Sequence, residues 1–414
     1  MTYSPSIDFP AEVNWAAFVR NGGIAEDRLV DSRGETELPH DQSLFVTRPA
    51  LPPLHELMPL LEDIWSSRVL SNDGKYHEAF ERELANYLQV PHVVLVSNAT
   101  LGLLLALRDS GMRGKVLTTP FSFVGTSHAL TFAGLDPVFV DIDADTLNID
   151  PVRLEEAMDE TITGILPVHC FGRSCDVDSI AVIADRHRVP VVYDAAHAFG
   201  VCDEGGSILR HGDYAVLSFH ATKVLNTFEG GAITTNDDRL ANTLSKMRNF
   251  GFVGADRVAI DGLNAKMSEP CAAMGLASLP GLGDIIAANR AMDARYREAL
   301  AGIPGFKPVP SPAGSNFHYL VAEVDQATFG LSRDALLYAL HTEGVFARRY
   351  YYPGCHRTAP FLSADTDPLP VTEAMGRRIL QLPTGTSVTA AEVAEIGRLV
   401  RLCHANAPAI AARL

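Results

Sequence analysis

The chain has 414 residues, of which 47% are apolar, and its formal net charge at pH 7 is −16. A chain of this length exceeds what one compact core usually organises, so we expect two domains. The negative charge argues against a general nucleic-acid binder or a membrane-surface binder, but it leaves room for a small anionic ligand held by helix N-termini.

The sequence shows no targeting or membrane-spanning pattern. The segment MTYSPSIDFPAEVNW lacks a basic stretch followed by an apolar core, and no apolar run approaches the roughly 20 residues that cross a bilayer. The six cysteines form no Cys-x-x-Cys pair, and His169, Cys170 and Cys175 lack the matching second pair that a zinc site requires. We therefore expect a cytoplasmic protein with reduced cysteines and no bound metal.

Two amphipathic helices are predicted after an N-terminal extension of residues 1–47. The stretch RPALPPLHELMPLLEDIWSSRVL holds the first helix behind a proline-rich lead. In YHEAFERELANYLQV, Phe80, Leu84 and Leu88 recur at helical spacing, which predicts a second helix with one buried face. The extension itself is weakly periodic and is expected to lie on the surface.

Short apolar strands then alternate with helix-length segments. The strand segments are HVVLVSN, KVLTTP, DPVFVDID, TGILPVH, VPVVYD, YAVLSFH and GGAITTN. Strands that are separated by helices pair mostly in parallel and are covered by helices on both faces. We therefore predict a large α/β domain over residues 48–285, built on a mostly parallel seven-stranded sheet.

The pattern changes after about residue 237. A long helical stretch over residues 268–303 is interrupted at Pro280-Gly281 and is suited to connect two domains. Beyond it, the strand-like FHYLVAEV mixes with the helix-like SRDALLYALHTEG and TAAEVAEIGRLVRLCHA. We predict a small C-terminal α+β domain over residues 286–414.

Polar and aromatic residues follow several predicted strands, at the edge where open parallel sheets bind ligands. HVVLVSN delivers Asn98, Ala99 and Thr100 to the start of a helix, whose free N–H groups and dipole suit a phosphate. Taken alone, this is also an ordinary N-cap. Phe123, in TTPFSFVGT, offers a flat apolar face at another strand end, although an aromatic there is often part of the core.

Two neighbouring strand segments end in ionisable side chains. VPVVYDAAHAFG places Asp194 at a strand end with His197 three residues later, a pair that taken alone favours a cap or an ion pair. YAVLSFHATK delivers Ser218, His220 and Lys223 to the turn before the next strand. A buried lysine costs desolvation free energy unless it is neutral, paired or covalently used.

Together these groups describe the binding site of pyridoxal phosphate. That cofactor needs a phosphate cradle, a carboxylate beside its ring nitrogen, a stacking face and a lysine that forms a Schiff base. The carboxylate keeps the ring nitrogen protonated, so that the ring can accept electrons. The lysine condenses with the aldehyde and later, as a free amine, moves protons.

Three segments closely resemble the DegT/DnrJ/EryC1/StrS aminotransferases, a branch of the fold-type I pyridoxal phosphate enzymes. They are VVYDAAHAFG, LSFHATKVLNTFEGGAITTND and GLNAKMSEPCAAMGLASL. The resemblance runs from about Arg48 to near the C-terminus and leaves out the first 47 residues. It implies the fold-type I architecture and a homodimer with active sites built across the interface.

The resemblance implies a role for each matching residue at the cofactor ring. Lys223 is the catalytic residue that binds the cofactor covalently. Asp194 pairs with the pyridine nitrogen, and His197, where many relatives have Gln, contacts the phenolic oxygen.

The resemblance likewise implies how the phosphate and the ring face are held. Ser218 and the backbone of Ala99 and Thr100 hold the phosphate, and Phe123 stacks on the ring. Asn264 reaches the phosphate from the neighbouring subunit. Relatives often have Gly in place of Ala99, but a backbone contact survives that change where φ is negative.

The substrates also follow from the resemblance. Members of the family act on nucleotide-linked keto-sugars, and the likeness around Lys223 favours amination at C4 of a dTDP-linked 4-keto-6-deoxy sugar, with L-glutamate as amino donor. The cofactor then alternates between pyridoxal and pyridoxamine phosphate, and the product serves deoxyamino sugar biosynthesis for O-antigens, other glycans or antibiotics. The candidate substrate-binding residues are His220, Asn249, Arg349, Tyr350 and His356, although a solvated edge backed by core aromatics explains ARRYYYPGCH equally well.

Several alternatives stay open at this point. One is amination at C3 instead of C4, and another is dehydration of the sugar, although dehydrating relatives replace the lysine with histidine. A non-catalytic regulator would be expected to lose Lys223 or Asp194, and both are present. An amino-acid aminotransferase needs an arginine fork for two carboxylates, and the spacing of Arg348 and Arg349 does not decide this.

Overall fold

The structure, a computed structural model, describes residues 43–362 and 368–412. Most of the predicted N-terminal extension, residues 1–42, lies outside the described residues. The central sheet is built from strands β2 (His92–Val96), β3 (Gly114–Thr118), β4 (Leu135–Phe139), β5 (Ile162–Leu166), β6 (Val192–Asp194), β9 (Tyr214–Ser218) and β10 (Gly231–Thr235).

These seven strands lie in the order β4-β3-β5-β6-β9-β10-β2. The pairings within β4-β3-β5 and within β2-β10-β9-β6 are continuous, and the bridges Ile165↔Val191 and Val168↔Asp194 join β5 to β6. All neighbours are parallel except β10, which is antiparallel to both β2 and β9. The prediction of a mostly parallel seven-stranded sheet is therefore confirmed.

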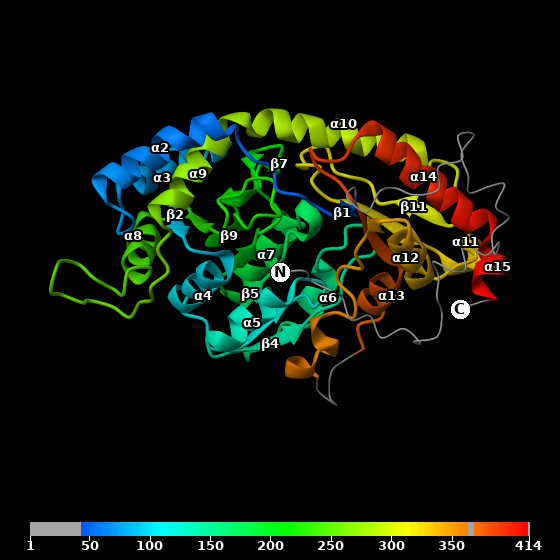
Figure 1. The fold of residues 1–414 in the computed structure, drawn as a ribbon. Coiled ribbons are helices and arrows are strands. Elements are labelled where there is room, and N and C mark those ends of the chain that lie inside the picture. Colours follow the sequence, from blue (N-terminus) through cyan, green and yellow to red (C-terminus); the bar gives the residue numbers. More distant parts are fainter. Residues whose placement is uncertain (1–42, 363–367, 413–414) are drawn as a thin grey trace.

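Helices cover both faces of this sheet (Figure 1). They are α3 (Lys75–Leu88), α4 (Ala99–Asp109), α5 (Val124–Phe132), α6 (Pro151–Glu156), α7 (Val177–His187), α8 (Asp238–Met247) and α9 (Glu269–Ser278). Helix α2 (Leu54–Ser67) packs against α9. Within β2, Leu95 belongs to a buried cluster with α3 and α7, whereas Val94 and Val96 belong to a second cluster with α4, α5 and α8. Successive strand residues point to opposite faces, so a strand buried on both faces reads as one apolar run.

The carboxyl-terminal part of the chain, after α9, forms a smaller unit around a three-stranded antiparallel sheet. Its order is β11-β12-β14, with β11 (Phe306–Pro308), β12 (Leu320–Val324) and β14 (Ile379–Leu382). Its helices are α11 (Gln326–Phe329), α12 (Arg333–Thr342), α13 (Pro370–Arg378), α14 (Ala390–Ala405) and α15 (Ala407–Ala411).

The remaining short elements lie in the connections of both units. They are the hairpin β7 (Cys202–Asp203) with β8 (Gly206–Ser207) and the 3-10 turns η3 (Cys170–Gly172), η4 (Ile208–Arg210), η6 (Cys355–Arg357) and η7 (Ala359–Phe361).

The last described part of the predicted extension joins this smaller unit. Strand β1 (Leu44–Phe45) pairs in parallel with β13 (Val345–Phe346), and Leu44 is buried in the core of the small unit. Phe45 stacks on Phe346 with ring centroids 5.1 Å apart. Residues 43–47 are therefore packed against the small unit.

One helix belongs to both cores. Helix α10 (Leu282–Leu300) follows α9 through the turn η5 (Leu279–Gly281) and runs along the edge of the molecule in Figure 1. Leu282 packs in the core of the large unit, whereas Met292, Tyr296 and Leu300 pack in that of the small unit. Between Leu282 and Met292 the helix passes from the core of the large unit to the core of the small unit. The predicted domain boundary at residue 285 lies within that stretch and stays a prediction.

The segment Glu269–Leu300 is long and apolar enough to cross a membrane by length and composition alone. It covers 32 residues, and 44% of its most apolar window is buried inside the fold. Because its buried apolar side chains pack in the two cores described above and, at Ala273, Met274 and Ala277, against α2, the composition of this segment is that of a core helix.

Candidate active site

The lysine found in the sequence lies in the turn between β9 and β10. Lys223 is half-buried, and its backbone N–H donates to the carbonyl oxygen of His220 at 2.9 Å. The side chain of Asn226 ties the same turn to the body by donating to the carbonyl oxygen of Ala50 at 2.7 Å. Burial lowers the pKa of Lys223 to about 8, and the negative charge of Asp194 opposes that shift. At pH 7 about a tenth of such an amine is unprotonated.

Asp194 ends β6, the strand next to β9, and the charges of its carboxylate and of the Lys223 amine influence each other. Asp194 is only 6% exposed. Its Oδ2 accepts from Oγ1 of Thr126 at 2.6 Å, and its Oδ1 accepts from the backbone N–H of Ala196 at 3.1 Å. Burial raises the pKa of this carboxyl group, which the two hydrogen bonds and Lys223 counteract. A buried carboxylate of this kind favours a cationic partner.

His197 is held in one tautomer by the protein backbone. Its Nδ1 accepts from the N–H of Phe171 at 3.1 Å, so the proton of the neutral ring is on Nε2. Burial and the nearby charge of Lys223 hold the pKa of His197 well below its usual range. The ring centroid lies 4.5 Å from that of Tyr319, and the hydroxyl of Tyr351 lies 3.4 Å from both ring nitrogens. The site therefore presents a neutral Nε2–H donor within an aromatic cluster.

The predicted phosphate cradle is formed at the start of α4. Asn98 caps this helix by accepting from the N–H of Leu101 at 2.9 Å, so the N–H groups of Ala99 and Thr100 are left without intrahelical partners. Strand β10 passes close by, because a Cβ at Gly231 would lie 2.8 Å from the nitrogen of Ala99. Only glycine permits this approach of the two backbones.

Ser218 and Phe123 lie at the ends of two other strands. Ser218 ends β9, and its Oγ accepts from the N–H of His220 at 3.4 Å. Phe123 precedes α5 and is 62% exposed. A Cβ at Gly125 would lie 3.1 Å from the Phe123 ring and 3.6 Å from Oγ1 of Thr100. The exposed aromatic face therefore adjoins the phosphate cradle, as a stacking surface for a bound ring requires.

The structure brings Asn249 and Asn264 together. Their backbones form a bridge, and Nζ of Lys266 donates to Oδ1 of Asn249 at 2.8 Å and of Asn264 at 2.9 Å. The carbonyl oxygen of Ala265 accepts from Ser97 at 2.7 Å, at the end of β2. Both asparagines therefore lie on the edge of the sheet that carries α4, and their roles toward phosphate and substrate stay predictions.

The other predicted substrate residues are engaged in contacts within the protein. Arg349 pairs with Asp334 at 3.2 Å, and the buried His356 lies 3.5 Å from Glu373. His220 is exposed and lies 3.6 Å from Glu229.

Tyr350 is placed differently from these ion-paired residues. Its ring centroid lies 5.2 Å from that of Tyr351. Tyr350 therefore adjoins Tyr351, the member of ARRYYYPGCH whose hydroxyl lies at His197. The substrate roles of Arg349, His356, His220 and Tyr350 stay predictions.

Sequence reasoning missed several residues that the fold brings to this site. Thr126 supports Asp194, and its Oγ1 lies 2.7 Å from Oγ of Ser122. Tyr319, Asn316 and His318 come from the segment leading into β12, more than 90 residues beyond Lys223. None of these last three belongs to a motif that could be recognised from spacing, because their positions depend on how the small unit packs on the large one.

His169 and the two cysteines near it are core residues in this structure. The N–H of Cys175 donates to Nδ1 of His169 at 3.1 Å, and the His169 ring stacks on Tyr193 with centroids 4.6 Å apart. Burial lowers the pKa of His169 to about 3. Within residues 43–362 and 368–412, no group of three or more His, Cys, Asp or Glu side chains is arranged to hold a metal ion.

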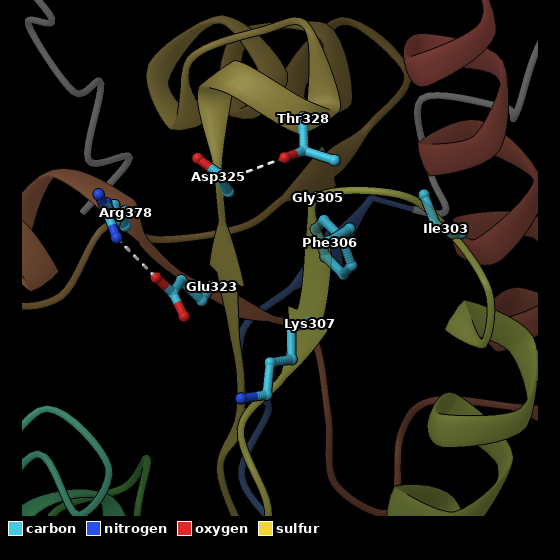
Figure 2. A pocket seen from close by; sticks show the side chains of 8 residues that line it. All are labelled: Ile303, Gly305, Phe306, Lys307, Glu323, Asp325, Thr328 and Arg378. Atoms are coloured by element: carbon cyan, nitrogen blue, oxygen red, sulfur yellow. Dashed lines mark hydrogen bonds and ion pairs between the residues drawn. The ribbon is translucent and has the colours of Figure 1, made fainter.

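Figure 2 shows a cavity of about 450 Å³ on the small unit. It is lined by Lys307 of β11 and by two acid-containing pairs: Arg378 with Glu323 at 3.1 Å, and Thr328 with Asp325 at 2.6 Å. Because its charged groups are largely paired with each other and none of the predicted site residues lines it, we place the active site at Lys223.

The chain is similar to known proteins over most of its length. The sequence profile of the DegT/DnrJ/EryC1/StrS aminotransferase family matches residues 55–401. A dTDP-4-amino-4,6-dideoxy-D-glucose transaminase of Shigella dysenteriae is 46% identical over 316 residues, which cover 76% of this chain and 86% of that protein. A transaminase of the same name from Escherichia coli is 38% identical over 87% of this chain and 99% of its own. The solved structure of DesI in the presence of its TDP-sugar product superposes with a TM-score of 0.85 at 40% identity, covering 88% of this chain and 93% of DesI.

Proposed function

The chain belongs to the DegT/DnrJ/EryC1/StrS aminotransferase family, and we propose that it moves an amino group from L-glutamate to a dTDP-linked 4-keto-6-deoxy sugar. The product is then a 4-amino-4,6-dideoxy sugar nucleotide. As a family member with the fold-type I architecture, the protein is an aminotransferase that depends on pyridoxal phosphate.

The residues of the site around Lys223 fit this cofactor. The buried carboxylate of Asp194 suits the protonated ring nitrogen, and the exposed face of Phe123 suits the ring. The free N–H groups of Ala99 and Thr100, with Ser218, suit the phosphate. When bound, pyridoxal phosphate supplies an electron-accepting ring that stabilises negative charge at the carbon bearing the amino group.

The chain's own residues bind, orient and move the proton. We assign Nζ of Lys223 to covalent attachment and to the uptake and return of the proton, since its lowered pKa leaves part of it unprotonated near neutral pH. Asp194 would hold the proton on the ring nitrogen, and Thr126 and Ala196 keep its carboxylate in place. His197 would offer its Nε2–H to the ring oxygen, because the N–H of Phe171 occupies the other nitrogen.

The observation that carries the substrate assignment is the likeness to two transaminases of one name, which extends to 99% of the Escherichia coli protein. The presence of both Lys223 and Asp194 argues against the alternatives. A sugar dehydratase of this family has histidine in place of the lysine, and a non-catalytic regulator would not be expected to keep both residues. Amination at C3 and a different nucleotide are left to the assay.

The proposal is tested by supplying the holoenzyme with L-glutamate and a panel of dTDP-linked and GDP-linked 3-keto and 4-keto sugars. We expect the release of 2-oxoglutarate to continue beyond the first turnover only when a 4-keto-6-deoxy sugar is present. Mass spectrometry and NMR should then show a product with an amino group at C4. Release of ammonia, amination at C3, or turnover with other keto acids alone would each replace this proposal by one of its alternatives.

We also propose a cytoplasmic homodimer in which Asn264 completes the phosphate site of the neighbouring subunit. The segment between α8 and α9 projects from the body in Figure 1 and leads to Asn264. It carries Phe250, Phe252 and Val258, which are 46%, 38% and 59% exposed. Apolar side chains on a projecting segment are suited to burial against a second copy.

A mixing experiment tests the sharing of sites. Lys223→Ala and Asn264→Asp are each expected to be impaired at limiting cofactor, the second because a carboxylate repels the phosphate. In a co-expressed mixture, half of the dimers are mixed and each has one intact site, so activity should recover to about a quarter of the wild type. A mixture of Lys223→Ala with Asp194→Asn should not recover, because both residues serve the same subunit's site. Absence of recovery in the first mixture would place Asn264 in its own subunit's site.

A further inference from the structure

His318 connects the small unit to the turn that carries the catalytic lysine. It lies just before β12 and is 5% exposed. Its Nε2 lies 2.9 Å from the carbonyl oxygen of Thr222, the residue that precedes Lys223. Because a carbonyl oxygen only accepts, Nε2 carries the proton and donates it to this bond.

The backbone at His318 is itself fixed by a second clamp. The N–H of His318 donates to Oδ1 of Asn316 at 3.1 Å. The amide of the fully buried Asn316 donates to the carbonyl oxygens of His197 and Phe199, at 2.9 Å and 3.0 Å. The segment 316–318 therefore holds the lysine turn through His318 and the turn after β6 through Asn316.

The imidazole of His318 is neutral and has one unused nitrogen. Burial and the charge of Lys223 lower its pKa to about 4, against the effect of the Thr222 carbonyl. Its Nδ1 is buried and has no hydrogen-bond partner among residues 43–362 and 368–412. A ring held only for packing would not need to bury such an acceptor, since a Phe or Leu side chain fills space without that cost.

We propose that His318 is a positioning residue, which holds the Thr222–Lys223 backbone in the position from which Nζ serves the cofactor site. The inference rests on the proposed function, because it concerns the placing of the amine that binds the cofactor. Through this bond the small unit takes part in setting the active site. A displacement of about 1 Å in a reacting group costs up to about 100-fold in rate.

Matched variants separate the hydrogen bond from packing. His318→Gln keeps an N–H donor at the position of Nε2, whereas His318→Asn places its amide near Nδ1 and His318→Phe removes the donor. His341, on α12, is the control, because its Nε2 makes the same kind of hydrogen bond. It lies 2.8 Å from the carbonyl oxygen of Ala347. Its Gln and Phe variants should leave activity unchanged.

Two measurements decide the proposal. We expect His318→Phe and His318→Asn to lower kcat of the glutamate half-reaction about 10- to 100-fold with little change in KM, and His318→Gln to stay within about threefold. In protein freed of cofactor, amide hydrogen exchange of residues 219–227 should quicken in the Phe and Asn variants and not in Gln.

Equal loss in all three variants without a change in exchange would overturn the positioning role, as would a Phe variant with wild-type kcat. If His318→Phe does not fold, the Gln and Asn pair decides alone. A wild type that exchanges as expected but never deaminates glutamate refutes the proposed function instead, since the exchange comparison needs no cofactor.

Discussion

Lys223→Ala is expected to reduce the steady-state rate of amino transfer by about 10⁴-fold, because it removes covalent attachment and the proton-moving amine together. Lys223→Arg should be as inactive, since a guanidinium is always protonated and can neither bind the cofactor covalently nor take up the proton. The measurement is release of 2-oxoglutarate from glutamate, together with borohydride reduction and mass spectrometry of the peptide that contains residue 223. The wild type should gain the mass of the reduced cofactor at that peptide, and neither variant should.

Lys75 provides a matched control on the same chain. It is an exposed lysine that pairs with Asp63 at 2.5 Å on the surface, so Lys75→Ala should keep full activity and should leave labelling of residue 223 intact. If borohydride instead fixed the cofactor on another lysine in the wild type, the assignment of the site itself would be wrong.

Asp194→Asn is expected to lower kcat by about 10²- to 10³-fold while leaving the fold intact. The substitution keeps the size of the side chain, an oxygen for the N–H of Ala196 and an amide N–H that can donate to the Thr126 hydroxyl, but it removes the charge that holds a proton on the ring nitrogen. Because burial raises the pKa of Asp194, replacement of its carboxylate by a neutral amide should not lower the melting temperature of the cofactor-free protein. Single-turnover kinetics with glutamate, alongside calorimetry, measure the two effects separately.

Thr126→Val serves as the graded comparison for Asp194. It removes one hydrogen bond to the carboxylate and keeps the charge, so we expect a loss of about tenfold, clearly smaller than that of Asp194→Asn. An Asp194→Asn enzyme that turns over at the wild-type rate would show that the ring nitrogen needs no anionic partner here.

The large sheet could be predicted because its physics is local. Each strand is buried on both faces, so it appears as a short apolar run, and the helices between strands supply the crossover connections that parallel pairing requires. The pairing of β1 with β13 could not be predicted in the same way. It joins two-residue strands about 300 residues apart, and a segment that short carries no periodicity of its own.

The residues of the active site likewise fall into those that local sequence predicts and those that only the packing of the two units brings there. Asp194, Ser218 and Lys223 end or follow adjacent strands. The rule that ligands bind beyond the carboxyl ends of parallel strands therefore predicted from the sequence that they share one site. Asn316 and His318 belong to the small unit, and their contacts depend on the packing of one unit on the other. Arg349 appeared to be a free cation in the sequence, whereas in the structure Asp334 pairs with it. Sequence alone cannot show which charges are already neutralised by neighbours.

The path of the chain through β1 and α10 has a practical consequence for protein engineering. The smaller unit is discontinuous in the gene, because Leu44 completes its core from the start of the chain and Met292, Tyr296 and Leu300 complete it from a helix that begins in the other core. A fragment that starts at residue 286 would lack the strand that lies beside β13. Chimaeras that exchange substrate specificity between relatives should therefore transplant residues 43–47 with the carboxyl-terminal part and place the junction outside α10.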